Sequence, residues 1–471
     1  MNLPADPSPA PVTVPAASAA PARAVAFEVF RLAWPAMMQA FMGTVVFFCD
    51  RLMLGWYGKE ELAALIPSGS ILWSVTSIFG VWTVGTLAVV ARDKGAGKTE
   101  WLREHVATSL WLAVAIGTLI TVPCILLAPQ LVGLFGAGAE VEANAADYLR
   151  ILLIVMPITF AGMTMMAAFT GVGNTFTPML VSGVSNALNI AGNWLLIFGN
   201  MGFPRLGIRG AAISSAAAFS IFTLLMLVFS LRKGSPLGMS PGDLLRASRD
   251  SLARITRVSV PAAFERTIFH AGFIGYAMIV TALGTTAMAA QEALIAIQSI
   301  VFLPGEGFGV AAGSIMGRAL GAGRVEDART GARAATWMAI TPLAMAGLVY
   351  AIAPEALLGL FTSDREIVSI GAPALIVGAF EGIFLGAFQT ISGGIRGAGD
   401  TRTPMLVTIT GVWLVRLPMC ALLGLPPELT WGLGLGLGLT GIWLGTLLDW
   451  SFRCTLIMLA FNAGRWKKMK V

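Results

Sequence analysis

The chain has 471 residues, of which 56% are hydrophobic and only 12% are charged. A soluble globular protein carries about a quarter charged residues, so this composition excludes that class and indicates a polytopic helical membrane protein. The net charge of +6 is modest, and the basic residues lie in short loops, which does not indicate a nucleic-acid partner. The cysteines show no metal or redox spacing, and no hydrolase or dinucleotide motif occurs. We therefore expect a protein that is not an enzyme and has no metal or cofactor.

Apolar segments long enough to cross a membrane recur along the whole sequence and predict an all-α fold with twelve transmembrane helices. The expected spans are 33–54, 62–90, 105–128, 148–170, 178–199, 211–231, 259–281, 285–316, 334–353, 367–391, 403–424 and 438–461. The Pro- and Ala-rich start predicts a disordered tail, and a long polar segment separates two halves. The expected parts are a tail over 1–26, a six-helix lobe over 27–231, a cytoplasmic linker over 232–257, a second six-helix lobe over 258–462 and a basic cytoplasmic tail over 463–471.

The distribution of basic residues predicts the orientation of the chain. If both termini and the even-numbered loops face one side, that side holds most of the 31 Lys and Arg residues. The opposite side holds only Arg51, Lys59, Arg150, Arg205, Arg209 and Arg365. Because cytoplasmic loops are enriched in Lys and Arg, both termini are expected in the cytoplasm.

The two halves of the sequence match one another at a constant shift. The shift that takes Pro35 to Pro261 also places the GAG triplet at 95–97 on the GAG triplet at 321–323. An even number of spans in each repeat gives both halves the same orientation. The repeat therefore predicts two bundles related by an axis along the membrane normal, which rock about a central cleft.

The first expected span contains a carboxylate, Asp50, toward its far end. Gln39, Gly43, Val46 and Asp50 are spaced four, three and four apart, so they share one face of a helix. A carboxylate in such a segment costs about 2.5–3.5 kcal/mol on insertion scales and usually faces a cavity or a partner. We predict that Asp50 is the main functional residue. The alternative is that it lies at the outer membrane surface, paired with Arg51.

The fifth expected span carries a polar stripe. Ser182, Asn186, Asn189 and Asn193 are again spaced four, three and four apart. Asparagine side chains in hydrocarbon need partners on other helices. The functional interpretation is that they meet Asp50 and form a proton or cation site. The alternative is interhelical hydrogen bonding without an ion.

Polar residues in other spans form a secondary set of candidates for ion coupling. They are Gln39 and its repeat counterpart Glu265, together with Glu292, Glu306 and Glu381. A pair such as Glu265 with Arg266 or Arg416 is alternatively a structural ion pair.

The fourth expected span carries the candidates for a substrate cleft. Met163, Met166 and Thr170 share a face of the fourth expected span, and Met side chains suit surfaces that bind several ligands. Tyr148 is a further candidate. The alternative is that these methionines face lipid or the core.

Several motifs together resemble one family. The segments LAWP, LAVVARDKGAG, GVGNTFTPM, AAGSIMGRALGAG and GGIRGAGDTRTPM are similar to those of the multidrug and toxic compound extrusion (MATE) family, in its DinF-like prokaryotic branch. The resemblance covers residues 30–460. It implies an antiporter of a bacterial inner membrane that exports organic, often cationic or amphipathic compounds in exchange for inward H⁺ or Na⁺. We expect a monomer whose partners are small organic substrates and the lipid bilayer.

The resemblance also bears on the site residues. Asp50 falls on the family's acidic position in the first span, and Asn189 falls on a polar position of the fifth. Asn193 stands where many prokaryotic members carry a second aspartate, and an amide can ligate Na⁺ but cannot carry a proton. Asp50 is therefore expected to be the only titrating group of its lobe.

Two other functions remain open. A lipid-linked precursor flippase of the same superfamily would favour several basic residues in a large cleft. A non-transporting receptor or scaffold would favour an appended soluble domain.

Overall fold

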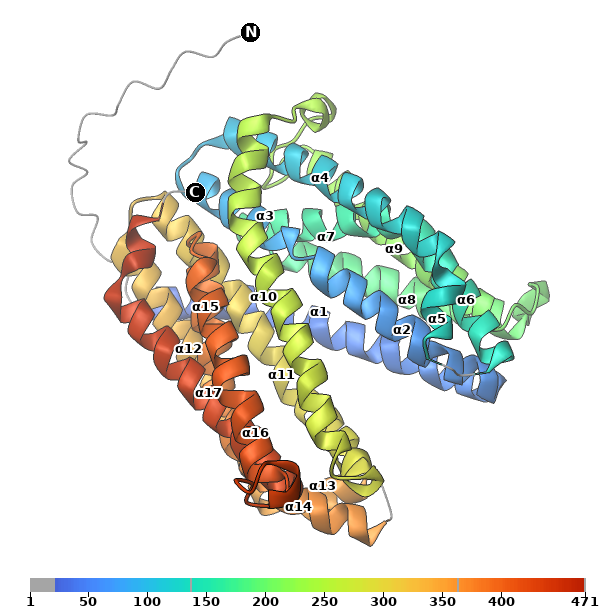
Figure 1. Ribbon diagram of the computed structural model, residues 1–471. Helices are drawn as coiled ribbons and strands as arrows, with labels where there is room; N and C mark the ends of the chain where they lie inside the picture. The colour runs from blue at the N-terminus through green and yellow to red at the C-terminus, as the bar shows by residue number, and fades with distance from the viewer. Residues whose placement is uncertain (1–21, 136–137, 362–363, 470–471) are drawn as a thin grey trace.

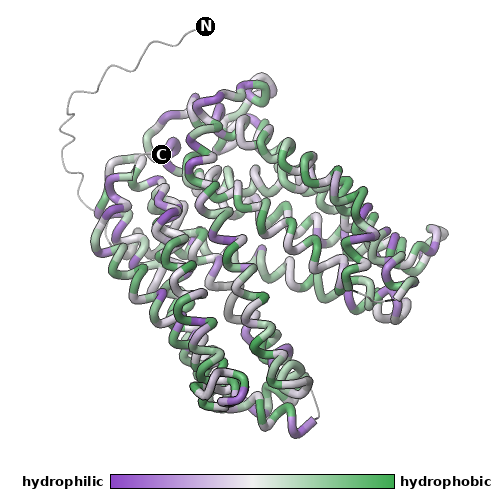
Figure 2. Tube along the Cα trace, viewed as in Figure 1, coloured by the Kyte–Doolittle hydropathy of each residue, from purple (hydrophilic) through white to green (hydrophobic). Residues whose placement is uncertain are grey.

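The chain folds into two helical bundles. The computed structural model describes residues 22–135, 138–361 and 364–469, and the regular elements of this part are all helical. Figure 1 shows the bundles as the two arms of a V, which meet at one end and diverge toward the other. Hydrophobic residues follow both arms over most of their length, and hydrophilic residues gather at the loops (Figure 2).

The N-terminal lobe contains the helices that precede the linker. They are α1 (Ala22–Tyr57), α2 (Lys59–Phe79), α3 (Trp82–Gly95), α4 (Thr99–Leu126), α5 (Ala128–Gly133), α6 (Ala139–Ile154), α7 (Met156–Gly171), α8 (Phe176–Phe198) and α9 (Ile208–Leu231).

The C-terminal lobe repeats this order with fewer interruptions. Its helices are α10 (Arg249–Thr281), α11 (Thr285–Gly321), α12 (Val325–Ile352), α13 (Pro354–Gly359), α14 (Arg365–Gly397), α15 (Arg402–Thr410), α16 (Leu417–Gly424) and α17 (Gly438–Ala463). A π-helical turn over Gly411–Arg416 joins α15 to α16.

Two expected spans of the N-terminal lobe are broken helices. The span expected over 62–90 consists of α2 and α3, which are separated at Gly80 and Val81. The span expected over 148–170 consists of α6 and α7, which meet at an angle of 54°. Pro157 lies in the first turn of α7, where its missing N–H leaves no helical hydrogen bond unmade.

The helices account for the twelve expected spans. Within the described residues, nine helices are long and apolar enough to cross a membrane, and the bent pair of α6 and α7 makes a tenth. α10 and α11 have 33 and 37 residues and complete the set.

Two predicted boundaries need correction. α1 begins at Ala22, so the last residues of the tail predicted over 1–26 are helical, whereas residues 1–21 lie outside the described part of the chain. α10 begins at Arg249, so the end of the linker predicted over 232–257 belongs to the first helix of the C-terminal lobe. The basic tail holds a short turn whose Trp466 is buried, with residues 470–471 outside the described part.

The first helix of each repeat crosses between the lobes. Val29, Leu32 and Ala33, in the first half of α1, are buried in a core cluster that otherwise belongs to the C-terminal lobe. The second half of α1 returns to its own lobe, where Leu54 is buried. Burial of such apolar side chains contributes about 1.5–3 kcal/mol each, so α1 fastens the two bundles together.

α10 makes the reciprocal crossing. In its first half, the Ser251 hydroxyl donates to Glu104 of α4 at 2.8 Å, and the Ser259 hydroxyl donates to the carbonyl of Trp82 of α3 at 3.4 Å. In its second half, Tyr276 is buried against residues of α16 and α17. The repeat therefore exchanges its first helices between lobes.

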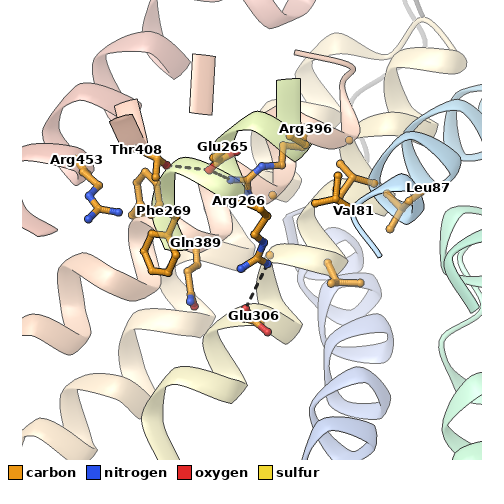
Figure 3. A pocket seen from close by; sticks show the side chains of 18 of the residues that line it. Val81, Leu87, Glu265, Arg266, Phe269, Glu306, Gln389, Arg396, Thr408 and Arg453 are labelled. Carbon is orange, nitrogen blue, oxygen red and sulfur yellow. Dashed lines mark hydrogen bonds and ion pairs between the residues drawn. The ribbon is translucent and has the colours of Figure 1, made fainter. Parts of the chain in front are cut away.

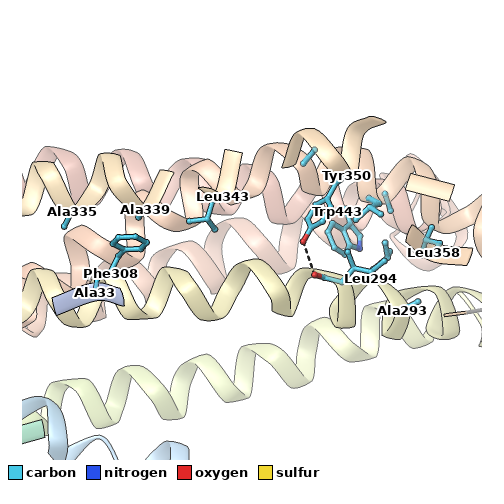
Figure 4. Packing of buried hydrophobic residues seen from close by; sticks show 14 of the residues in the cluster. Ala33, Ala293, Leu294, Phe308, Ala335, Ala339, Leu343, Tyr350, Leu358 and Trp443 are labelled. Atoms are coloured by element: carbon cyan, nitrogen blue, oxygen red, sulfur yellow. Dashed lines mark hydrogen bonds between the residues drawn. The ribbon is translucent and has the colours of Figure 1, made fainter. Parts of the chain in front are cut away.

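The largest core cluster fills the C-terminal lobe between α11, α12 and α14 (Figure 4). Ala335, Ala339 and Leu343 follow one face of α12 at spacings of four. The small side chains of the two alanines allow the neighbouring helices to approach closely. Tyr350 is buried, and its hydroxyl donates to the carbonyl of Ile297 at 2.9 Å.

The lobes touch backbone to backbone at the closed end of the V. A Cβ atom added to Gly95 would lie 1.9 Å from the carbonyl oxygen of Arg318, and one added to Gly321 would lie 2.0 Å from that of Arg92. The two contacts are equivalent, because the internal repeat places Arg92 on Arg318 and Gly95 on Gly321. Arg92 also donates to the carbonyl of Ala398 at 3.3 Å.

We predict that Gly321→Val opens the closed end, because the atoms in the way of the new side chain are backbone and cannot move aside. Ser314 is buried, and its hydroxyl donates to the carbonyl of Thr170 across the interface at 2.6 Å. In a cysteine-free background, labelling of Ser314→Cys by a water-soluble maleimide should rise on the order of tenfold in the valine variant. Gly69→Val is the control, since a Cβ there meets nothing within 4 Å. Equal labelling in all variants would contradict the prediction.

The linker between the lobes is folded against α4. Leu237 and Met239 are buried in the core of the N-terminal lobe, and the indole of Trp111 donates to the carbonyl of Leu244 at 2.9 Å. The linker therefore packs against the N-terminal lobe.

Asp243 organises a short turn over Pro241–Leu245 within the linker. The backbone N–H and the hydroxyl of Ser240 both donate to its carboxylate at 2.8 Å. Burial raises the pKa of Asp243, but these bonds and the nearby Arg103 and Arg246 outweigh it, so the pKa lies below its ordinary value. The ionised carboxylate is therefore the form that holds the turn.

We predict that Asp243→Asn loosens this turn at neutral pH, with a cost of about 0.5–2 kcal/mol as for other lost caps. A carboxylate with a lowered pKa stabilises the fold above its unfolded pKa of about 3.9, and this contribution disappears as the pH falls through the folded pKa. The mobility of a nitroxide at position 245, measured by electron paramagnetic resonance, should thus be higher in the variant at pH 7. The two proteins should converge in strong acid, and equal mobility at pH 7 would refute the assignment.

Candidate functional site

Asp50 lies in a polar cluster inside the N-terminal lobe, where α1 packs against α8 and α9. Its half-buried carboxylate accepts a hydrogen bond from the amide of Asn193 at 2.5 Å. With its amide nitrogen toward the carboxylate, Asn189 donates to Asp50 at 3.1 Å and accepts from the Ser215 hydroxyl at 3.0 Å. Asn193 and Asn189 are buried. The predicted meeting of the first and fifth spans at Asp50 is therefore present in the structure.

Two further residues complete this cluster. Ser214 donates to the carbonyl of Asn189 at 2.8 Å, and Tyr148 is buried where it interacts with both Asp50 and Ser215. Sequence reasoning missed Ser214 and Ser215, although two adjacent serines in an apolar helix are a signal for polar contacts. Tyr148, predicted for the substrate cleft, instead belongs to the wall of the Asp50 cluster.

Arg51 does not pair with Asp50. Its guanidinium carbon lies 3.3 Å from the ring centre of Phe47, which is a cation–π contact on the same helix. The alternative interpretation of Asp50, as half of a surface ion pair with its neighbour, is therefore wrong.

Two predicted coupling residues lie outside the cluster. Asn186 is half-buried and forms no side-chain hydrogen bond with any described residue of the cluster. The amide of Gln39 donates to the sulfur of Met166 on α7 at 2.8 Å. A shared helix face with Asp50 thus did not bring Gln39 to the same site.

The acidic candidates of the C-terminal lobe separate into different environments. Glu265 is buried, with Arg396 at 2.5 Å and the Thr408 hydroxyl at 2.8 Å. Glu381 is buried and accepts from Gln298 at 2.6 Å and from Thr446. Each of these carboxylates is satisfied by neighbours.

Glu292 and Glu306 are both exposed. Glu306 lies 4.0 Å from Arg266, whereas Glu292 is outside the cavity described below. The predicted pairing of Glu265 with Arg266 or Arg416 is replaced by its pairing with Arg396.

A buried ionic triad in the C-terminal lobe was not predicted. The Asp449 carboxylate accepts from Arg416 at 2.8 Å and from two nitrogens of Arg453, and its side chain has no exposed surface. Gly411, in the π-helical turn, allows the approach, because a Cβ there would lie 2.5 Å from both Arg453 and Asp449. The available signal was the spacing of four between Asp449 and Arg453 in an apolar span.

A cavity of about 280 Å³ lies between α3 and the C-terminal lobe. Val84 and Leu87 of α3, with Val81 just before it, form one wall. Polar side chains from α10, α11, α14 and α17 face them. Figure 3 shows Glu265 between Arg396 and Thr408, and Arg266 reaching toward Glu306.

The residues predicted for the cleft do not line this cavity. Met163 packs against the core of the N-terminal lobe, and Met166 contacts Gln39. Thr170 is buried at the lobe interface, where its carbonyl accepts from Ser314. None of the four predicted residues therefore lines this cavity. Tyr148 and Met163 pack inside the N-terminal lobe, whereas Met166 and Thr170 lie against α1 and α11.

We predict that Asp449→Asn destabilises the protein by about 3–5 kcal/mol, because two buried guanidinium groups lose their carboxylate. Asp147→Asn is a matched control. Asp147 accepts from Arg209 at 2.6 Å, but both side chains are partly exposed, so the cost should be at most about 1 kcal/mol. The free energy of unfolding in mixed micelles provides the measurement. Equal costs for the two variants would show that the triad contributes no more than a surface pair.

Comparison with known proteins gives a consistent result over the whole chain. The MatE family model matches residues 35–195 and again residues 261–422, and the two matches begin at the repeat-related prolines Pro35 and Pro261. The chain is 31% identical over 457 residues to the probable multidrug resistance protein NorM of Thermotoga maritima, covering 94% of each. It is 26% identical over 446 residues to the multidrug resistance protein NorM of Vibrio vulnificus, covering 92% of this chain and 94% of that protein.

Solved structures are similar in fold. The Vibrio cholerae MATE transporter VcmN in the bent form has a TM-score of 0.83 at 21% identity, covering 94% of this chain and 98% of that one. An outward-facing multidrug resistance MATE family transporter of the MOP superfamily has a TM-score of 0.84 at 21% identity, covering 94% and 97%. The predicted fold class, an all-α membrane protein with twelve helices in two repeated lobes, is confirmed.

Proposed function

The chain belongs to the MATE family of multidrug transporters, and we propose that it is an antiporter that exports organic compounds in exchange for inward H⁺ or Na⁺. We place it in a bacterial inner membrane with both termini in the cytoplasm, so that the arms of the V diverge outward. Each chain contains both lobes and the Asp50 cluster, which supports a working monomer.

The Asp50 cluster is the observation that supports ion coupling. An ionised carboxylate only accepts hydrogen bonds, as Asp50 does from Asn193, whereas a protonated one also donates. The carbonyl oxygen of the Asn193 amide has no partner among the described residues, so it can accept from a protonated Asp50 after the amide rotates. Proton binding would therefore rearrange the contact between α1 and α8.

The same cluster offers oxygen ligands for Na⁺. Hard cations bind carboxylate, amide and hydroxyl oxygens, and Asp50, Asn193 and Ser215 supply one of each. Separate H⁺ and Na⁺ gradients are thus required to identify the ion.

The crossing of α1 supports coupling between this site and the lobe movement. The first half of α1 is anchored by Leu32 in the core of the C-terminal lobe, and its second half carries Asp50. A change in the contacts of Asp50 acts on a helix that both lobes hold. Alternating access then follows from separation of the lobes at the closed end and closure at the other.

We predict that Asp50→Asn abolishes gradient-driven export, because an amide cannot take up and release a proton. The measurement is dye export from liposomes that contain the purified protein, under separate H⁺ and Na⁺ gradients. Asp147→Asn, in the same lobe but in a partly exposed ion pair, serves as the control and should export normally. Export by Asp50→Asn at the rate of the unmodified protein would reject the assignment.

A further inference from the structure

We propose that the cavity beside α3 binds the acidic group of an aromatic substrate, so that zwitterionic and anionic compounds are exported in preference to simple organic cations. This inference rests on the proposed export function and specifies its substrate class. It concerns equilibrium binding in the C-terminal lobe, whereas the coupling site lies in the N-terminal lobe.

The lining of the cavity carries more positive than negative charge. Three arginines and two glutamates contribute to it, namely Arg266, Arg396, Arg453, Glu265 and Glu306. A charged ligand loses hydration when it enters a cavity, and side chains of opposite charge compensate directly for that loss. The excess here favours a ligand that brings a negative charge.

Two of the arginines are already held by carboxylates. Arg396 lies 2.5 Å from Glu265, and Arg453 donates to Asp449, which it shares with Arg416. These bonds fix the two guanidinium groups in the wall of the cavity. The pair of Arg396 and Glu265 has no net charge, whereas the two arginines that share Asp449 leave one positive charge in the wall. Neither arginine has much capacity left for a direct bond to a ligand.

Arg266 is the group available to the ligand. Its nearest carboxylate oxygen, on Glu306, is 4.0 Å away, which is beyond hydrogen-bond distance, and the two side chains are 46% and 45% exposed. An arginine presents a planar fork that suits a carboxylate or a phosphate. A ligand carboxylate at this position would form a direct ion pair with Arg266 in place of the 4.0 Å contact with Glu306. Glu306 would then be available to bind an amine of the ligand.

The remaining walls suit a flat ring system. Phe269, Phe388 and Trp450 line the cavity opposite the aliphatic side chains of α3. The guanidinium carbon of Arg453 lies 4.5 Å from the Trp450 ring centre, so a cationic group lies directly beside the aromatic wall. The volume of about 280 Å³ accommodates part of a small drug-like molecule, namely a ring that bears its acidic group.

The test is equilibrium binding of two matched dyes to the full chain in nanodiscs of neutral phosphatidylcholine, measured by fluorescence anisotropy. One dye is a zwitterionic xanthene with a free benzoate carboxylate, and the other is its cationic methyl ester. The free acid should bind about tenfold more tightly, the value of one charge-assisted hydrogen bond. No ion gradient is present, so loss of coupling would leave this result unchanged.

Arg266→Gln should remove the preference for the free acid, and Arg266→Lys should restore part of it. Glu306→Gln should strengthen binding of the acid, because a competing carboxylate is lost. Arg209→Gln, which removes an arginine from a pair with Asp147 in the other lobe, is the matched control and should not change either affinity. The proposal is overturned if the ester binds as tightly as the acid, or if the preference survives Arg266→Gln. If that variant does not fold, failure of Glu306→Gln to strengthen acid binding overturns it.

Discussion

The contact of backbone on backbone at Gly95 and Gly321 is the constraint on which the two-lobed arrangement depends. Because no side chain fits at either position, this close approach of the lobes requires glycine at both. The cavity lies against the same interface, since Leu87 and Gly313 both line it and approach one another across it. Separation of the lobes there would therefore dismantle one wall of the cavity.

The two repeats share one arrangement of helices but differ in structure at equivalent positions. The N-terminal lobe breaks its helices at Gly80 and at Val155, and the shift that relates the repeats takes these positions to Glu306 and Glu381. The helices of the C-terminal lobe continue through both places. Where the N-terminal lobe interrupts a helix, the C-terminal lobe has an unbroken helix that carries a glutamate.

The sequence predicted a contact correctly where the residues of one helix face determine that contact. The helical period and the high cost of a buried carboxylate were sufficient to bring Asp50 and Asn193 together. The prediction failed where the position of a neighbouring helix determines what a side chain contacts. Asn186 belongs to the same stripe but meets no partner in the cluster, and the face of Met163 points into the lobe core. Asp449 was missed because its triad includes an arginine from a distant segment, which spacing along one helix does not reveal.

The exchange of first helices has a consequence for how such a chain arose. Neither half contains a complete core, since Leu32 of the first half fills the second lobe and Ser259 of the second half packs on the first. If a single repeat once existed as a separate protein, it would have left this gap unfilled as a monomer. Two copies would have closed it by swapping their first helices, which is a low-cost route to a symmetric dimer. Gene fusion then would have joined partners that already depended on each other, and freed each half to diverge in chemistry.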